Sequence, residues 1–376
     1  MEKNVVNTFI ECLLPITACN IKCHYCYVAQ RDNRKMRQAR LKYPPDIIAK
    51  ALRKDRVGGT AYISICGAGE TMMQKELPDI VNLLLQEGHF VNITTNGTID
   101  IAFKTIVEKL PLPMRGKLNF SFSLHYIELK RRGWIEKFFD NFNYARQAGS
   151  SVVLQMNLCD EYVDYFDEIK SICLERAGAL PQLAATRDEQ NLDSDIRLFT
   201  KHSKEEYNNF GEEFDSPLFR FTMRNFMVSR KEFCYAGKWT YVLNLSTGIL
   251  KPCYASQIRQ NIFEDIDRPI KFQPVGNHCH SPFCMNSSHF LALGNIPSLL
   301  SPSYADLRNR HCTDGREWYT EEFKEAMSGK LYENNDADFD RYAYQRQAIE
   351  DGLLHYGATI LSPKMRQKIK SIFHVP

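Results

Sequence analysis

Residues 19–27 read C-N-I-K-C-H-Y-C-Y, and the rest of the chain is interpreted from this stretch. Cys19, Cys23 and Cys26 fall within eight positions in the spacing C-x3-C-x2-C, and no fourth cysteine follows nearby. An iron–sulfur cluster with four irons normally takes four thiolates, so three thiolates leave one iron open to a small molecule. A zinc knuckle and three buried thiols are the alternatives. Zinc would need a fourth ligand, and His24 lies at an unusual offset for that role.

The cysteine spacing resembles the signature loop of the radical S-adenosylmethionine (SAM) superfamily, and Tyr25, just before the third cysteine, fits the same pattern. The resemblance implies that Cys19, Cys23 and Cys26 are the catalytic cysteines and hold a [4Fe–4S] cluster whose open iron binds SAM. It also implies that SAM is reductively cleaved to a 5′-deoxyadenosyl radical, which abstracts hydrogen from a C–H bond of the substrate.

A second motif follows the apolar run A-Y-I-S-I-C at residues 61–66, which reads as a buried strand. The run ends in Gly67-Ala68-Gly69-Glu70-Thr71. Alone, G-A-G-E would be only a turn. Behind this cysteine loop it resembles the superfamily's G-G-E motif, with Ala68 in place of one glycine. The resemblance implies that Gly67, Gly69 and Glu70 contact SAM.

Apolar runs of strand length alternate with segments of helical periodicity through the first half of the chain. The predicted strands are residues 6–14, 61–66, 89–94, 118–124, 150–158 and 180–186, and helices are predicted near 46–56, 74–88, 99–110, 134–149 and 161–177. This alternation favours an α/β fold with a parallel sheet and crossover helices. In the radical SAM superfamily such a core is a partial (β/α)6 TIM-like barrel.

Polar residues collect at the predicted carboxyl ends of the strands, where parallel sheets place their sites. Besides Glu70, these residues are Asn96, Ser123, His125 and Asn157. The resemblance implies that Asn96 and Ser123 face SAM or its ribose, and we add His125 and Asn157 as candidate cofactor contacts. A hydrogen-bonded structural role is an equal alternative for His125.

Four further cysteines gather in the second half of the chain. Cys234 and Cys253 bracket a predicted hairpin, and Cys279 and Cys284 follow in N-H-C-H-S-P-F-C-M-N. The pattern resembles the auxiliary-cluster domain called SPASM or, when shorter, Twitch, and implies one auxiliary [4Fe–4S] cluster held by these four thiolates. A structural zinc is the alternative, in which His278, His280 or His289 replaces one thiolate.

Cys66, Cys159 and Cys312 are among the five cysteines outside the two proposed ligand sets. Free cysteine is commonly a small packing residue, and this is the default interpretation for each. Cys312 lies outside the regular strand–helix alternation. We therefore hypothesise that Cys312 donates hydrogen to a substrate radical or completes the auxiliary ligand set.

Domain organisation follows from these motifs. We expect a radical SAM core at residues 1–195, a bridging segment at 196–230, a SPASM/Twitch-like domain at 231–300 and a helical region at 301–376. The basic, amphipathic stretch 364–374 is interpreted as a solvated helix face.

Composition narrows the class of protein. A formal charge of +3 over 376 residues argues against nucleic acid or an anionic membrane as partner. No apolar run approaches a membrane span, and no secretory signal is evident. Twelve cysteines without such a signal favour metal ligation in a reducing compartment, so a cytoplasmic location is expected.

The expected function is modification, oxidation or epimerisation of a peptide or small polar substrate, with a flavodoxin- or ferredoxin-type electron donor. A cluster loop that begins at residue 19 leaves no room for an N-terminal peptide-recognition domain, which weakens the peptide hypothesis. A sugar, aminocyclitol or nucleotide dehydrogenase or epimerase is one alternative. A non-catalytic Fe–S or zinc scaffold is another, disfavoured by Gly69 and Glu70.

Overall fold

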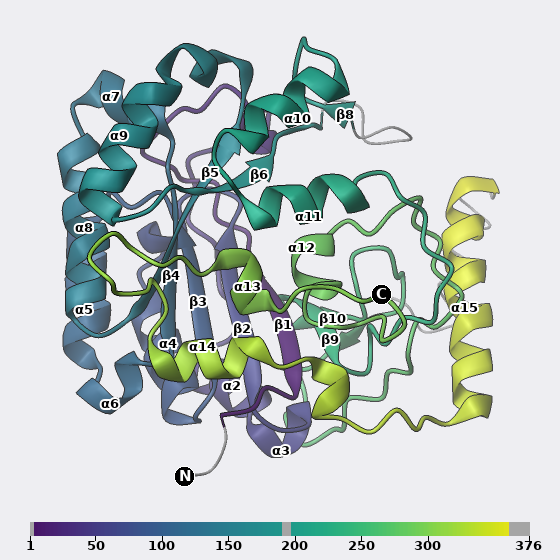
Figure 1. Ribbon diagram of the computed structural model, residues 1–376. Helices are drawn as coiled ribbons and strands as arrows, with labels where there is room; N and C mark the ends of the chain where they lie inside the picture. Colours follow the sequence, from purple (N-terminus) through teal and green to yellow (C-terminus); the bar gives the residue numbers. More distant parts are fainter. Residues whose placement is uncertain (1–3, 190–196, 361–376) are drawn as a thin grey trace.

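A nine-stranded sheet forms the centre of the computed structural model, which describes residues 4–189 and 197–360 (Figure 1). The strand order is β11-β10-β9-β1-β2-β3-β4-β5-β6. The strands are β1 (Thr8–Leu14), β2 (Ala61–Gly67), β3 (Phe90–Thr95), β4 (Leu118–Ser123), β5 (Ser151–Leu158), β6 (Gln182–Ala185), β9 (Thr240–Asn244), β10 (Ile249–Lys251) and β11 (Gln260–Asn261). A separate antiparallel pair consists of β7 (Arg187–Asp188) and β8 (Arg197–Leu198).

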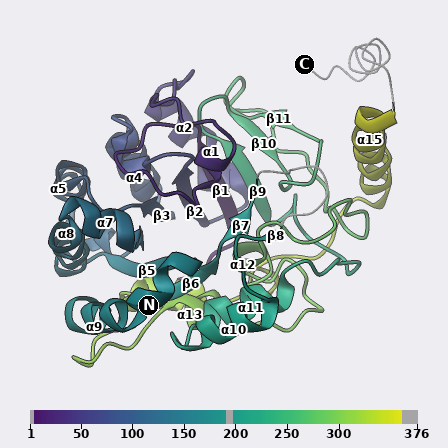
Figure 2. The same ribbon diagram turned by 90° about the horizontal axis from the view of Figure 1, so that it is seen from above.

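Strands β1 to β6 pair in parallel, each with the next along the chain. Seen from above, they form an open arc with helices on its outer side (Figure 2). The helices are α1 (Tyr27–Gln30), α2 (Pro45–Ala51), α3 (Lys54–Val57), α4 (Leu77–Gln86), α5 (Asp100–Lys109), α6 (Leu112–Arg115), α7 (Tyr126–Arg132), α8 (Ile135–Gln147), α9 (Phe166–Ala177), α10 (Lys204–Glu212), α11 (Pro217–Asn225), α12 (Ser287–Phe290), α13 (Tyr304–Arg308), α14 (Glu321–Ser328) and α15 (Arg341–Ile360), with 3₁₀ turns η1 (Thr71–Met73), η2 (Asp160–Tyr165) and η3 (Leu331–Glu333). The predicted partial barrel is confirmed.

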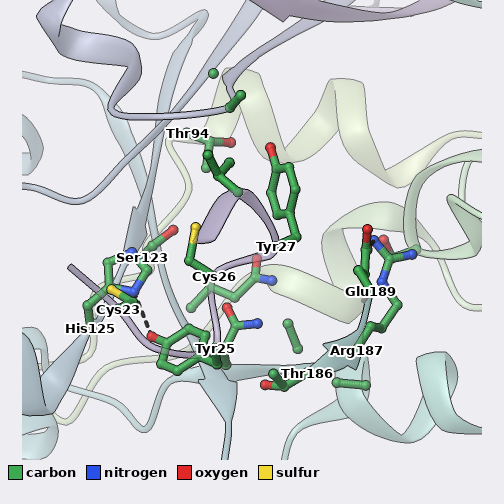
Figure 3. A pocket seen from close by; sticks show the side chains of 18 of the residues that line it. Cys23, Tyr25, Cys26, Tyr27, Thr94, Ser123, His125, Thr186, Arg187 and Glu189 are labelled. Atoms are coloured by element: carbon green, nitrogen blue, oxygen red, sulfur yellow. Dashed lines mark hydrogen bonds and ion pairs between the residues drawn. The ribbon is translucent and has the colours of Figure 1, made fainter. Parts of the chain in front are cut away.

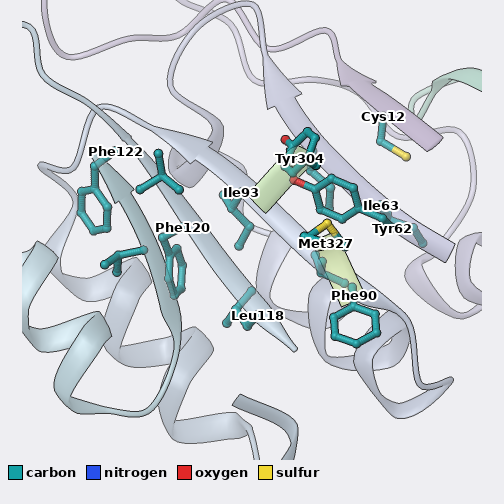
Figure 4. Packing of buried hydrophobic residues seen from close by; sticks show 14 of the residues in the cluster. Cys12, Tyr62, Ile63, Phe90, Ile93, Leu118, Phe120, Phe122, Tyr304 and Met327 are labelled. Atoms are coloured by element: carbon teal, nitrogen blue, oxygen red, sulfur yellow. The ribbon is translucent and has the colours of Figure 1, made fainter. Parts of the chain in front are cut away.

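The central strands are buried because apolar side chains cover both of their faces. Tyr62 of β2 packs edge-on against Tyr304 of α13 at a ring separation of 5.3 Å, and their hydroxyls lie 3.0 Å apart. Phe323 of α14 stands 5.8 Å from Phe90 of β3. Figure 4 shows Tyr304 and Met327 beside Tyr62 and Phe90. The C-terminal region therefore forms part of the same core as the first three strands.

The segment predicted as an auxiliary domain joins this sheet. Strand β9 pairs in parallel with β1, and β10 returns antiparallel to β9, which is the predicted hairpin. Helix α15 packs on this region at the edge of the molecule (Figure 1). Its Asp351 accepts hydrogen bonds from the backbone N–H groups of Gln257 and Ile258, at 2.6 and 3.2 Å.

The predicted helical character of residues 301–376 holds where the structure describes them. The amphipathic stretch 364–374 lies outside the described residues. None of the described helices has both the length and the apolar composition needed to cross a membrane.

Candidate active site

The three cysteines of the N-terminal motif line one cavity of about 410 Å³ at the carboxyl ends of the parallel strands. They belong to residues 19–26, here called the cluster loop, which follows β1. Figure 3 shows Cys23, Tyr25 and Cys26 at this cavity. Parallel sheets place binding sites at this edge because the loops that follow the strands converge there.

Contacts from β3 and α7 hold the cluster loop in place. Asn96, which follows β3, donates to Asn20 Oδ1 at 2.8 Å, and Asn20 donates to Thr98 at 2.7 Å. The amide nitrogen of Asn96 also lies 3.9 Å from Cys19 Sγ. On the other side of the loop, the backbone N–H of Lys22 donates to Glu128 of α7 at 2.8 Å. The cysteines are thus fixed by elements that follow two different strands.

Tyr25 anchors the loop from within. Its hydroxyl lies 2.6 Å from His125 Nδ1, after β4, and 3.1 Å from the Tyr162 hydroxyl, after β5. Figure 3 shows Tyr25 and His125 joined in this way. Burial lowers the pKa of His125 to about 4, so its imidazole is neutral at physiological pH. His125 therefore combines a hydrogen bond to the cluster loop with a place on the cavity wall.

The predicted G-A-G-E turn lies directly against the cluster loop. The backbone N–H of Gly69 donates to Ile16 O at 2.6 Å, and that of Glu70 donates to Ala18 O at 2.8 Å. A Cβ atom on Gly69 would lie only 2.2 Å from Ala18 O. Only glycine permits so close an approach of the two backbones.

The Glu70 side chain is buried, with an exposed fraction of 2%, and has three donors from the protein. It accepts from Thr95 Oγ1 at 2.6 Å, Asn96 N at 2.7 Å and Met72 N at 2.9 Å. Burial raises the pKa of this carboxyl group, and the three hydrogen bonds oppose that rise. Glu70 thus ties the end of β2 to the end of β3 while it borders the cavity.

Ser123 and Asn157, predicted from the strand ends, also line the cavity. Sequence reasoning missed the charged residues Arg34, Arg187 and Glu189 on its wall. Arg187 pairs with Glu189 at 2.9 Å, and Arg31 pairs with the other carboxylate oxygen. These residues lie in loops and in the two-residue strand β7, where no periodic pattern marks them.

The four cysteines of the second half converge on a smaller cavity of about 50 Å³. Cys234, Cys253, Cys279 and Cys284 all line it, and Cys284 also lines the larger cavity. No three of these sulfur atoms lie within 4.8 Å of one another. Four thiolates are a donor set that suits a single zinc ion or a four-iron cluster.

The three histidines weighed as substitute ligands do not line this smaller cavity. His289 is partly buried, stacks on Phe9 at a ring separation of 5.4 Å and lies 2.7 Å from Asn286 Oδ1. His278 and His280 line an open hollow on the other side of Cys279. Four thiols are therefore the donor set that the structure brings together.

Cys312 lines neither cavity. Its sulfur contacts Arg146 and the carbonyl of Ala177, and it packs on Gly178, which caps the C-terminal end of α9. Residues between α9 and β6 lie at the amino edge of the sheet, opposite the site. The structure therefore does not bring Cys312 to the substrate or to the auxiliary cysteines, because the chain that carries it packs under the barrel.

Cys66 and Cys159 lie near the site. Cys66 donates to Glu11 Oε1 at 3.2 Å, and Asn286, on the cavity wall, donates to Glu11 Oε2 at 3.1 Å. Cys159 is buried after β5, on the outer side of the cluster loop.

Residues 13–171 match the family model described as the radical SAM superfamily. No curated protein matches the chain. Among solved structures, SuiB of Streptococcus suis bound to S-adenosylmethionine is similar at 16% identity, with 92% of this chain and 79% of that chain covered and a TM-score of 0.49. The histidine-tagged form of anSMEcpe with bound AdoMet is similar at 13% identity, with 96% and 98% covered and a TM-score of 0.47.

Another SuiB structure, without a named ligand, is similar at 16% identity and a TM-score of 0.48. The alignment covers 70% of this chain and 64% of that one. The match to SuiB bound to its precursor peptide SuiA likewise spans 64% of that chain.

Proposed function

We propose, from the premise that residues 13–171 form a radical SAM domain, that this radical SAM enzyme abstracts hydrogen from a C–H bond of a peptide or small polar substrate. One observation carries the proposal. Cys19, Cys23 and Cys26 line a single cavity at the carboxyl edge of the sheet, and Cys284 lines both that cavity and the smaller one of the four later cysteines.

The donor sets fit two iron–sulfur clusters. Three thiols in one loop leave a coordination position open toward the cavity, and four thiols form a closed set beside it. When bound, the open cluster and SAM would supply the reductive cleavage that generates a hydrogen-abstracting 5′-deoxyadenosyl group. The protein's task is then to hold both partners, orient the C–H bond and exclude water.

Named residues suit these tasks. Asn96 and Tyr25 fix the cluster loop, and the backbone of Gly67 and Gly69 gives SAM a close approach. Ser123 and Asn157 offer hydrogen-bonding groups on the cavity wall. A flavodoxin- or ferredoxin-type protein would supply the electron.

The far end of the cavity favours a small polar substrate over a peptide. Its wall carries Arg187, Glu189, Asn286, Ser287 and Ser288, which are groups that bind hydroxyl, amide or anionic substituents. Arg187 also donates to the carbonyl of Met285 at 3.4 Å. This contact and the Arg31–Glu189–Arg187 ion pairs link the walls of the cavity. A sugar, aminocyclitol or nucleotide substrate fits this lining.

The decisive experiment replaces one thiol of the cluster loop. Anaerobically reconstituted Cys26→Ala protein should lose reductive cleavage of SAM by about a hundredfold or more, measured as 5′-deoxyadenosine under dithionite, because an incomplete ligand set does not retain the cluster. Cys173→Ala is the matched control, since Cys173 is buried in α9 and lines neither cavity. Wild-type cleavage in Cys26→Ala would refute the proposed ligand set.

A further inference from the structure

A third group of metal-ligating side chains lies outside both cysteine cavities. His24 Nε2, Cys159 Sγ and a carboxylate oxygen of Glu161 all come within 4.8 Å of one another. Across residues 4–189 and 197–360, this is the one group of three or more such donors that meets this distance. Neither the radical SAM reaction nor the auxiliary site uses these three residues.

The fold brings the three donors together for a clear reason. Tyr25 turns into the protein to reach His125 and Tyr162, and its neighbour His24 faces outward. Cys159 follows β5 and directly precedes η2, whose first turn carries Glu161. The Tyr25–Tyr162 contact at 3.1 Å holds the cluster loop against η2. Two loops fixed to each other therefore carry the three donors.

The chemistry of the donors is that of a zinc site with an open position. Imidazole, thiolate and carboxylate are the three ligand types that zinc takes in proteins, and three protein ligands leave a fourth position for water. Cys159 is 1% exposed, whereas the side chains of His24 and Glu161 are 44% and 50% exposed. Tetrahedral nitrogen and sulfur ligands stand roughly 3.5 Å apart. Small rotations of the two exposed side chains would reach that separation.

His24 and Glu161 already form an ion pair at 3.0 Å. That contact alone is an ordinary surface pair, and exposed pairs contribute little to stability. The buried thiol behind it distinguishes this site. A second pair, His311 Nδ1 with Glu317 Oε1, has the same 3.0 Å separation, but among the described residues no third donor lies within ligand distance of it.

We propose that His24, Cys159 and Glu161 bind one divalent transition-metal ion of the zinc type, on the outer side of the cluster loop. The ion would join the loop to the end of β5. The site is separate from the two iron–sulfur sites, and its test does not require the enzyme's substrate.

Full-length protein with reconstituted clusters is incubated anaerobically with ZnCl₂, passed through a desalting column and assayed for zinc and iron. About one zinc per chain is expected. His24→Ala and Glu161→Gln should each weaken zinc binding about tenfold or more in competition with a chromogenic chelator, with iron content unchanged. His311→Ala should bind zinc like the wild type. His24 and Glu161 are half-exposed, so His24→Ala and Glu161→Gln should fold. Cys159 is buried, so Cys159→Ser is not used as a test variant.

Zinc X-ray absorption then identifies the ligands. One sulfur and about three nitrogen or oxygen neighbours are expected around the zinc. Failure of the wild type to retain zinc, or equal zinc affinity in wild type and both variants, would overturn the proposal. Four sulfur neighbours would overturn it too, because they would place the zinc at Cys234, Cys253, Cys279 and Cys284.

Discussion

The buried carboxyl groups Glu70 and Glu11 differ in their partners: Glu70 lines the cavity, whereas Glu11 contacts the cavity wall through Asn286. Glu70 accepts from two backbone N–H groups and a hydroxyl. Glu11 is 5% exposed and accepts only from the weak thiol donor Cys66 and from Asn286. Burial raises the pKa of Glu11 to about 7, and its hydrogen bonds and the more distant Arg308 oppose that rise only in part.

Glu11 is therefore predicted to make folding stability depend on pH. The unfolded chain releases this proton near pH 4.5 and the folded protein near pH 7, so this group's contribution to stability falls as pH rises through that window. Above both pKa values, the buried charge of Glu11 lowers the free energy of unfolding by roughly 3 kcal/mol. Glu11→Gln removes it, so the variant should gain stability relative to wild type between pH 5 and pH 8, measured by anaerobic denaturant unfolding.

The control for this measurement is Glu205→Gln, because Glu205 lies exposed on α10. The free energy of unfolding of Glu205→Gln should differ from that of the wild type by a nearly constant amount between pH 5 and pH 8. A Glu11→Gln difference that is equally flat would show that Glu11 keeps its ordinary acidity in the folded protein.

At the scale of elements, the site is assembled by the contact between the end of β2 and the chain leading into the cluster loop. Backbone bonds from Ala68, Gly69 and Glu70 continue the β1–β2 ladder beyond the last paired residues. The pairing of β1 with β2 therefore also fixes the position of the chain that leads into the cluster loop. A change in this turn should move the cysteines even though it touches none of them.

Gly69→Ala tests that link. The added Cβ would meet Ala18 O at 2.2 Å, so the two backbones must separate, at a cost of about 1–3 kcal/mol. We expect a lower melting temperature and weaker SAM binding by calorimetry. Ala68→Gly is the matched control, since it restores the glycine of the resembling motif and should cost less than about 1 kcal/mol. Equal changes in melting temperature and SAM binding for the two variants would mean that the Gly69 and Ala18 backbones can separate without consequence.

At the scale of the whole molecule, the two cysteine sites are neighbours because one sheet carries both. Strand β9 lies beside β1, so the hairpin that precedes Cys253 is built onto the strand that precedes Cys19. Residues 283–286 line both cavities and so form a wall that the two cavities share. The site of the four later cysteines therefore shares part of its wall with the larger cavity.

Cys253→Ala should lower the iron content by about half and destabilise the region around β10, because loss of a ligand removes metal-linked folding free energy. SAM cleavage without substrate should persist, since Cys253 does not line the larger cavity. Iron and sulfide assays with 5′-deoxyadenosine quantification check this. Stoichiometric zinc in the wild type, with iron unchanged in the variant, would instead assign a structural zinc to the four thiols.

The parts of the site carried by local sequence were predictable. Cluster-loop ligands must be close in sequence to share one loop, and strand ends follow from apolar runs that stop at polar residues. For these reasons Cys19, Cys23, Cys26, Gly69, Ser123 and Asn157 were found in advance on the cavity wall. The four later cysteines, two of which bracket the hairpin, also line one cavity, and their role as one ligand set stays a prediction.

Tertiary packing decided what local pattern does not encode. Cys312 has the same chemistry as the other thiols, yet the chain returns it to the amino edge of the sheet. Arg187 and Glu189 reach the cavity from a short loop, and Glu11 meets Asn286 from 275 residues away in the chain. His24, Cys159 and Glu161 likewise meet only because the cluster loop packs on η2. Sequence spacing determines which donors share a loop, whereas only the folded chain determines which loops touch.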